Sequence, residues 1–546
     1  MSKSRLNLMC VVMASIVISW SLAAPQKALG IPAFARQYNT SCTTCHTNFP
    51  KLNDFGRAFK DAGFKFPKDD EGFLKVPNIM LGAPAQKELW PKSVWPGTIP
   101  GLPPIGFRMN NFFQVVGRNR NQIANALTPT GSVPPFIPRT DFQTGFFSIF
   151  AAGNFGSDIA FWVDDDISIG GANSNGGLGD GYLKFVNLGR LAKLPTDSFS
   201  LRLGQFELDL PFTQARSYNL SPYDIYSQAN IGAMNSLFPS QQNVNNTFAF
   251  SNVAQGVEIS GGHSYGGYHY SLALVNQNTG GSIASSDFVP SATGGASGGG
   301  VGFFSDSNFK DLYGRMSYRF NLERDATSRK DVQAAGSMGP HDHTSLNIGT
   351  FYLYGRSVQR FAGETSGGAP AVLTAREPFY RTGGDFNFNY RLVNIYGLFM
   401  YGHDHNLLPV DSTGTIIPLP LSAPVATGFT RSIPAKFSGG FVQADLQFYP
   451  WLMGIMRWDS VNSSADRLNG LAQTTGTSFF APYKSTRNRI TPGIQFLIHA
   501  NIKMSAEYQF RPQQSVTSLI NPLTGQPMPT NPFRTNTVTF GTEFVF

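Results

Sequence analysis

The sequence predicts a mainly β protein, an antiparallel transmembrane β-barrel of about sixteen strands preceded by a small α-helical domain. Three observations support this fold class. Charged residues make up only 14% of the 546 residues while aromatic residues make up 13%, the chain begins with a leader for export, and residues 105–546 alternate apolar with polar positions. Transmembrane barrels combine these features because each strand turns one face to lipid and the other to the lumen.

Residues 1–30 have the pattern of a secretory signal peptide. A basic start and the apolar stretch Leu8–Leu22 precede small residues, so cleavage after Ala24 or after Gly30 fits the pattern. No later stretch is apolar for long enough to form a transmembrane helix. The formal charge of +8 falls to +5 when the three cations of the leader are removed with it. A balance this mild and scattered gives no reason to expect a nucleic-acid partner.

The barrel prediction rests on a period of two that runs through residues 105–546. Apolar residues occupy one face of each predicted strand while polar residues occupy the other, as in Leu312, Met316, Tyr318 and Phe320, in Val442, Ala444, Leu446 and Phe448, and in Val538, Phe540, Phe544 and Phe546. Sixteen such strands begin between residues 105 and 536, and short connections alternate with long ones. Because short turns belong on the periplasmic side, we expect a bacterial outer-membrane protein with both chain ends in the periplasm. The connections 188–198 and 321–343 are longer than this rule predicts.

The motif Cys42-Thr43-Thr44-Cys45-His46 predicts covalent attachment of one c-type haem. Two thiols on one turn reach the two vinyl groups, and the adjacent imidazole becomes the proximal iron ligand. The alternatives are a redox dithiol and a zinc site. The mature chain offers no other cysteine for a Cys₄ zinc site, and no βαβ context surrounds the motif as a thioredoxin-like dithiol would require.

Residues 31–90 are predicted to form the haem-binding domain. Leu52, Phe55, Phe59 and Ala62 repeat at helical spacing, and we expect this stripe to pack against the haem. Residues 91–104 are rich in proline and predict a stiff linker to the barrel at 105–546. A domain this small is expected either to enter the barrel lumen as a plug or to hang in the periplasm.

The sixth iron ligand is open at this stage. Met80 is the only methionine of residues 31–90, and its Pro/Gly-flanked loop suits a distal ligand. The alternatives are a core role for Met80, ligation by Met109, by water, or by a histidine from the rest of the chain.

The run Pro32–His46, followed by Phe55-Gly56-Arg57 and Phe59-Lys60, resembles the fused cytochrome–porins, the outer-membrane monohaem cytochromes associated with iron oxidation. Gly204–Phe212 in the barrel is also similar. The resemblance implies electron transfer across the outer membrane, from an extracellular donor such as Fe(II) to a periplasmic carrier such as a soluble cytochrome. It carries Cys42, Cys45 and His46 over as haem residues.

Two His-Asp-His triplets are candidate metal contacts, His341-Asp342-His343 and His403-Asp404-His405. Alternate positions of an extended chain place both imidazoles on one side, where they can bind a transition metal. The first triplet is expected in the periplasm, while His403 and His405 open an extracellular loop. The simpler interpretation is that these are ordinary loop histidines.

The leading functional hypothesis is a redox conduit, an electron-transfer protein or an Fe(II)-oxidising oxidoreductase in which one haem c carries the electron and the barrel insulates it. The same arrangement would also serve outward transfer to an extracellular acceptor. Two rival hypotheses remain: a diffusion porin with the haem domain as plug or gate, and a barrel that only anchors a periplasmic electron carrier.

Overall fold

The computed structural model describes residues 33–66 of the N-terminal part and most of the barrel strands with their short turns. The described ranges are 33–66, 70, 74–76, 79–80, 88–89, 98–99, 101, 104–116, 140–156, 158–167, 177–195, 197–213, 219–221, 223–228, 253–263, 266–276, 309–322, 344–364, 370–405, 407–415, 427–431, 434–463, 486–510 and 536–545. The predicted leader, most of the predicted linker and the triplet at 341–343 lie outside these ranges.

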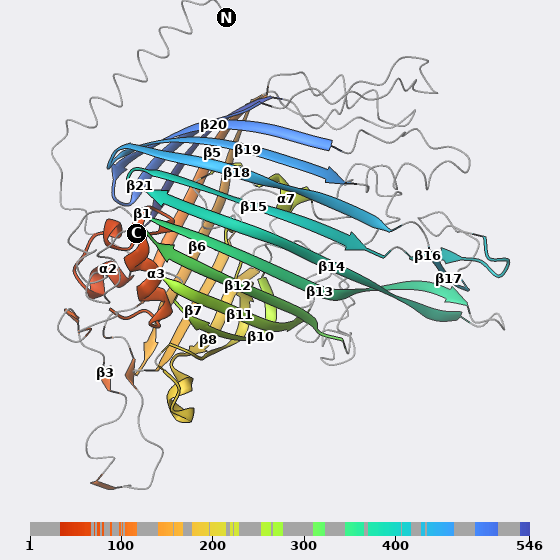
Figure 1. The fold of residues 1–546 in the computed structure, drawn as a ribbon, viewed down its shortest axis with the longest axis horizontal. Coiled ribbons are helices and arrows are strands. Elements are labelled where there is room, and N and C mark those ends of the chain that lie inside the picture. Colours follow the sequence, from red (N-terminus) through yellow and green to blue (C-terminus); the bar gives the residue numbers. More distant parts are fainter. Residues whose placement is uncertain are drawn as a thin grey trace, which may run out of the picture.

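Sixteen antiparallel strands close into one barrel, as the sequence predicts (Figure 1). Each strand pairs with its neighbour in sequence, and the last strand pairs with the first. The strands are β5 (Ile105–Val116), β6 (Thr140–Phe155), β7 (Ile159–Ile167), β8 (Gly177–Phe185), β9 (Ser200–Glu207), β10 (Val253–Gly262), β11 (Gly267–Asn276), β12 (Asp311–Asn321), β13 (Ser345–Glu364), β14 (Pro370–Tyr390), β15 (Val393–Asp404), β18 (Ala435–Tyr449), β19 (Leu452–Ser463), β20 (Thr486–His499), β21 (Ile502–Gln509) and β22 (Thr537–Val545).

The outer face of the barrel is apolar, and the alternation predicted from the sequence sets which side chains it carries. Large exposed apolar residues include Met316, Tyr318, Phe399, Leu446, Phe448, Trp458 and Phe540. Their neighbours in sequence, among them Arg315, Asp445 and Thr539, are buried on the lumen side. A closed barrel with an apolar outer surface and a polar inner one is the structure of a bacterial outer-membrane protein. Among the described residues no helix is long and apolar enough to cross a membrane.

The short turns lie at one end of the barrel, together with both ends of the described chain. Two-residue turns join β14 to β15, β18 to β19 and β20 to β21, and Val545 at the end of β22 bonds to Asn501 in the last of these turns (3.0 Å). Figure 1 shows the N-terminal helices and the C-terminus side by side at this end. Because short turns face the periplasm in such barrels, this is the periplasmic mouth.

Residues 33–66, here called the N-terminal module, lie in the periplasmic mouth. The module contains α2 (Ala33–Gln37), the 3₁₀ turn η1 (Cys42–Thr44), the paired strands β1 (His46–Asn48) and β2 (Lys51–Leu52), and α3 (Asp54–Asp61). Asp54 forms an ion pair with Arg319 of the barrel (2.6 Å), and both side chains are buried. Lys503 donates to the carbonyl oxygen of Phe49 (3.0 Å). Of the two positions expected for this domain, the described part occupies the mouth of the lumen.

A second part of the chain closes the lumen above the module. This lumen segment comprises the described residues of 208–228 between β9 and β10, including α7 (Asp224–Gln228). Tyr223 stacks on Phe441 (4.0 Å between ring centroids), and Arg489 pairs with Asp224 (3.1 Å). The alternation of short and long connections predicts that the long connection after β9 lies outside the cell. The described residues of that loop instead fold inward, because the buried charges and aromatic rings of the lumen wall bind them.

The module and the lumen segment form two successive layers along the same strands. On three strands one lumen-facing residue contacts the module. A second residue on the same strand, two or four positions farther from the periplasm, contacts the lumen segment. These pairs are Arg319 and Arg315 on β12, Asp445 and Gln443 on β18, and Lys503 and Glu507 on β21. Two to four residues of a strand span about 7–13 Å. Among the described residues, two layers of inserted chain therefore contact the lumen wall near its periplasmic end.

The orientation can be tested with two inserted epitopes. An epitope placed after Gly414, in the exposed turn between β16 (Leu407–Val410) and β17 (Gly428–Arg431), should be labelled on intact cells. An epitope placed after Ala192, in the short helix η3 (Leu188–Ala192) between β8 and β9, should be labelled only after permeabilisation. The opposite pattern would show that the barrel is inverted relative to this description.

Candidate functional site

The two cysteines of the motif lie on one turn of 3₁₀ helix. The backbone N–H of Cys45 donates to the carbonyl oxygen of Cys42 (3.2 Å). Residues three apart on a 3₁₀ helix lie on the same side, so the turn directs both side chains the same way. Both cysteines are free thiols, and the turn provides the arrangement that two thioether bonds to one haem require.

Asn53 fixes this turn to the N-terminus of α3. Its Nδ2 donates to the carbonyl oxygens of Thr43 (3.3 Å) and Thr44 (3.1 Å), the two residues between the cysteines. Its Oδ1 accepts from the backbone N–H of Gly56 (2.9 Å) and so caps the helix. The buried side chain of Asn53 therefore forms hydrogen bonds both to backbone carbonyls of the turn and to a backbone N–H at the start of α3.

Gly56 allows α3 to lie directly on the turn. A Cβ at this position would be 2.1 Å from the carbonyl oxygen of Cys45, far inside any permitted contact. The sequence analysis included Gly56 in the motif of the resemblance, and the structure gives a physical reason for a glycine here.

His46 follows the turn with one ring nitrogen already bonded. Its Nδ1 donates to the carbonyl oxygen of Pro50 (3.1 Å), which leaves the lone pair of Nε2 for a metal ion. Burial lowers the pKa of His46 to about 4; Lys503 and Arg108 contribute in the same direction, while the backbone hydrogen bonds at Pro50 and Lys51 oppose it. The imidazole is therefore neutral near pH 7, the form that binds iron. The geometry of His46 fits a proximal haem ligand.

The two thiols do not resemble a redox dithiol. Burial raises the pKa of Cys42, and burial raises the pKa of Cys45 to about 12. Reactive dithiols need a lowered thiol pKa, because the thiolate is the nucleophile. The raised thiol pKa values therefore argue against thiol–disulfide exchange at this motif.

The apolar stripe of α3 packs on aromatic residues of the module and on the barrel. Phe59 contacts Tyr38 (5.7 Å between centroids), and Phe55 contacts Phe66 (5.0 Å). Phe64 lies against Trp162 of β7 (5.8 Å). The sequence analysis expected this stripe to face the haem. In the structure Phe59 belongs to one buried cluster with Phe64 and with Ala152 and Ala160 of the barrel, so this cluster joins the thin core of the module to the barrel wall.

Met80 lies in β3 (Ile79–Met80), which pairs with β4 (Thr98–Ile99). Figure 1 shows this small sheet away from α2 and α3. Its role as the distal ligand stays a prediction, and so do the alternatives.

His403 and His405 lie side by side with 5.0 Å between ring centroids, as the extended-chain argument expects. Asp404 points the other way, into the lumen, where it pairs with Arg381. Within the described ranges no three His, Cys, Asp or Glu side chains are placed to hold a metal ion. Two imidazoles alone make an incomplete site, and a metal there remains a prediction.

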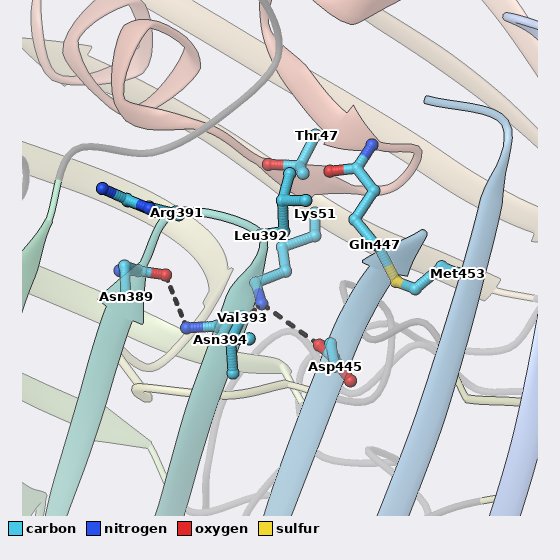
Figure 2. A pocket seen from close by; sticks show the side chains of 10 residues that line it. All are labelled: Thr47, Lys51, Asn389, Arg391, Leu392, Val393, Asn394, Asp445, Gln447 and Met453. Atoms are coloured by element: carbon cyan, nitrogen blue, oxygen red, sulfur yellow. Dashed lines mark hydrogen bonds and ion pairs between the residues drawn. The ribbon is translucent and has the colours of Figure 1, made fainter. Parts of the chain in front are cut away.

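The residues that hold the module against the barrel were not found from the sequence. Lys51 bonds to Asn394 of β15 and to Asp445 of β18 (3.4 Å), as Figure 2 shows. Hundreds of positions separate these partners in the chain, and no local pattern connects them. The nearest sequence signal was the presence of charges on the lumen face of each predicted strand.

No protein-family model matches the sequence, and no curated protein matches it. Among solved structures, the chain is similar to OmpT, an outer membrane protein of Vibrio cholerae (8% identity, TM-score 0.38, covering 82% of this chain and 98% of that one). It is also similar to the outer membrane channel DcaP of Acinetobacter baumannii (10%, 0.39, covering 81% and 96%) and to Salmonella typhi OmpF in complex with daunomycin (12%, 0.39, covering 81% and 97%). The barrel described above rests on the strand pairings of this chain itself.

Substitution of Asn53 tests how the motif is positioned. Asn53→Leu removes the helix cap and leaves two carbonyl oxygens of the turn without donors, which should destabilise the module by about 2–4 kcal/mol. Asn53→Asp keeps the cap and loses only the two donated bonds. In haem-free protein we expect maleimide to label Cys42 and Cys45 fastest in Asn53→Leu and slowest in the wild type, with Asn53→Asp between them. Equal labelling rates in all three would contradict the positioning role.

Proposed function

We propose that this protein is an outer-membrane redox protein that holds one c-type haem in the periplasmic mouth of its barrel. The observation that supports this most directly is the arrangement of Cys42, Cys45 and His46. Two thiols lie on one turn, and the following imidazole is neutral with Nδ1 bonded to a backbone carbonyl. Cys42 and Cys45 would form the thioether bonds, and His46 would be the proximal ligand. Bound haem supplies a one-electron Fe(III)/Fe(II) couple.

The inserted chain inside the barrel favours a redox conduit over an open pore. Porin lumens are polar and hold water, whereas here a buried apolar cluster joins the lumen segment to the wall. Its members include Leu210, Tyr223, Ile225, Tyr226, Tyr313, Phe351, Phe379, Leu398, Met400, Phe437 and Phe441. Such a cluster replaces part of the polar lining that a diffusion pore would offer to water and ions. The barrel would then insulate and position the redox centre, with an extracellular donor such as Fe(II) and a periplasmic carrier as partners.

A second candidate function is a diffusion channel in which the N-terminal module acts as plug or gate. The barrel favours this candidate, since sixteen strands enclose a lumen wide enough for solutes once the inner parts move. A diffusion channel requires only the barrel fold. Haem and electron transfer require the further observations on the motif.

The redox proposal is tested in two steps with the purified full-length protein. A denaturing gel stained for haem should show covalent haem in the wild type and none in Cys42→Ala with Cys45→Ala. Vesicles containing the protein, with Fe(II) outside and a trapped one-electron acceptor inside, should then reduce the acceptor only when the haem is present. A wild-type band that loses its haem in acid–acetone would overturn the proposal.

Conductance in a planar bilayer separates the two candidates. A redox conduit with a filled lumen should show little or no ionic current. A large and stable current through the wild-type protein would favour the channel.

A further inference from the structure

Four buried polar atoms lack a hydrogen-bond partner beside His46. They are Thr47 Oγ1, both side-chain polar atoms of Asn48, and Gln447 Nε2. Asn48 is 2% exposed and Gln447 is 4% exposed. An unsatisfied buried donor or acceptor costs about 1–3 kcal/mol, so a polar group or ordered water bound at these atoms would stabilise the site.

Two of these atoms line a cavity between the module and the barrel wall. The cavity has a volume of about 30 Å³, room for about two water-sized groups. Figure 2 shows Thr47 of β1 and Gln447 of β18 among the residues that line it, with Lys51 running from the module toward the strands below. The site therefore takes one donor from the module and one from the barrel.

The charges around this cavity are unbalanced toward the positive. Its lining contains Lys51 and Arg391 but only one carboxylate, Asp445. On the other side of the motif, Arg108 and Lys503 both lie over the ring of Phe49 (5.3 and 6.0 Å), and Glu543 binds both (2.5 and 2.6 Å). The cavity lining therefore carries two cations and one carboxylate, an arrangement that favours a bound anion.

We propose that this cavity binds a carboxylate of the haem, so that Gln447 of the barrel and Thr47 of the module share the cofactor. The inference rests on the proposed function and adds a binding site to it. The carboxylate of a haem propionate is small enough for this cavity. It accepts hydrogen bonds from an amide and a hydroxyl, and its negative charge would balance the cations of the lining. The module alone would then hold the haem incompletely, and docking in the barrel would complete the site.

The test uses the full-length haem-loaded protein and three substitutions. Gln447→Leu and Thr47→Val each remove one donor with little change of volume, and Gln447→Glu places a negative charge against the carboxylate. Donors facing the carboxylate reduce the negative potential at the iron, so their loss stabilises ferric haem. We expect a lower reduction potential in all three variants, lowest in Gln447→Glu, and a shifted propionate band in the resonance Raman spectrum. Gln509→Leu, another buried glutamine of the lumen, should leave both unchanged.

The outcomes separate this inference from the proposed function. Suppose that Gln447→Leu and Thr47→Val bind the normal amount of haem, and that the reduction potential and the propionate band are unchanged. This result would show that ordered water fills the cavity, and it would overturn this inference but not the proposed function. Absence of covalent haem from the wild type would overturn the proposed function. Heat-resistant migration of the folded barrel on gels verifies that each variant has folded.

Discussion

The ion pair between Asp54 and Arg319 is the constraint on which the placement of the N-terminal module depends. Both side chains are almost fully buried, and Asp54 also pairs with Arg57 of the same helix. Breaking a buried pair by removing one partner costs about 3–5 kcal/mol, because the remaining charge stays buried without compensation. The first turn of α3 is therefore fixed to β12, and Asn53 and Gly56 fix the haem-attachment turn to α3.

The same principle explains why the lumen is filled in two layers. Charged side chains on the inner face of the barrel need partners, and the described parts of the lumen provide them from inserted chain. The module satisfies the charges nearest the periplasm, and the lumen segment satisfies the next ones along each strand. Arg457, for example, bonds to Ser221 of the lumen segment and to Asp459 beside it on β19 (2.9 Å). The closure of this lumen is thus part of the packing of the barrel wall.

The barrel could be predicted from the sequence because a period of two is a local property. The alternation at 312–320 and 442–448 placed each side chain on its correct face, and the motif at 42–46 identified the candidate site without any tertiary information. The inward path of the lumen segment could not be predicted, since a long connection of mixed polar and apolar residues between two strands resembles an extracellular loop. Gln447 illustrates the same limit. Its position in a strand predicts that it faces the lumen, but its proximity to Thr47 depends on docking of the module.

Hydrogen exchange of α3 tests most directly the claim that the module is docked in the barrel through its buried charges. The amides of Asp54–Asp61 should be protected in the native protein and should lose much of that protection in Arg319→Gln. Arg381→Gln breaks an equally buried lumen pair, with Asp404, that does not touch the module, and it should leave α3 protected. Equal protection of α3 in the wild type and in Arg319→Gln would contradict the account.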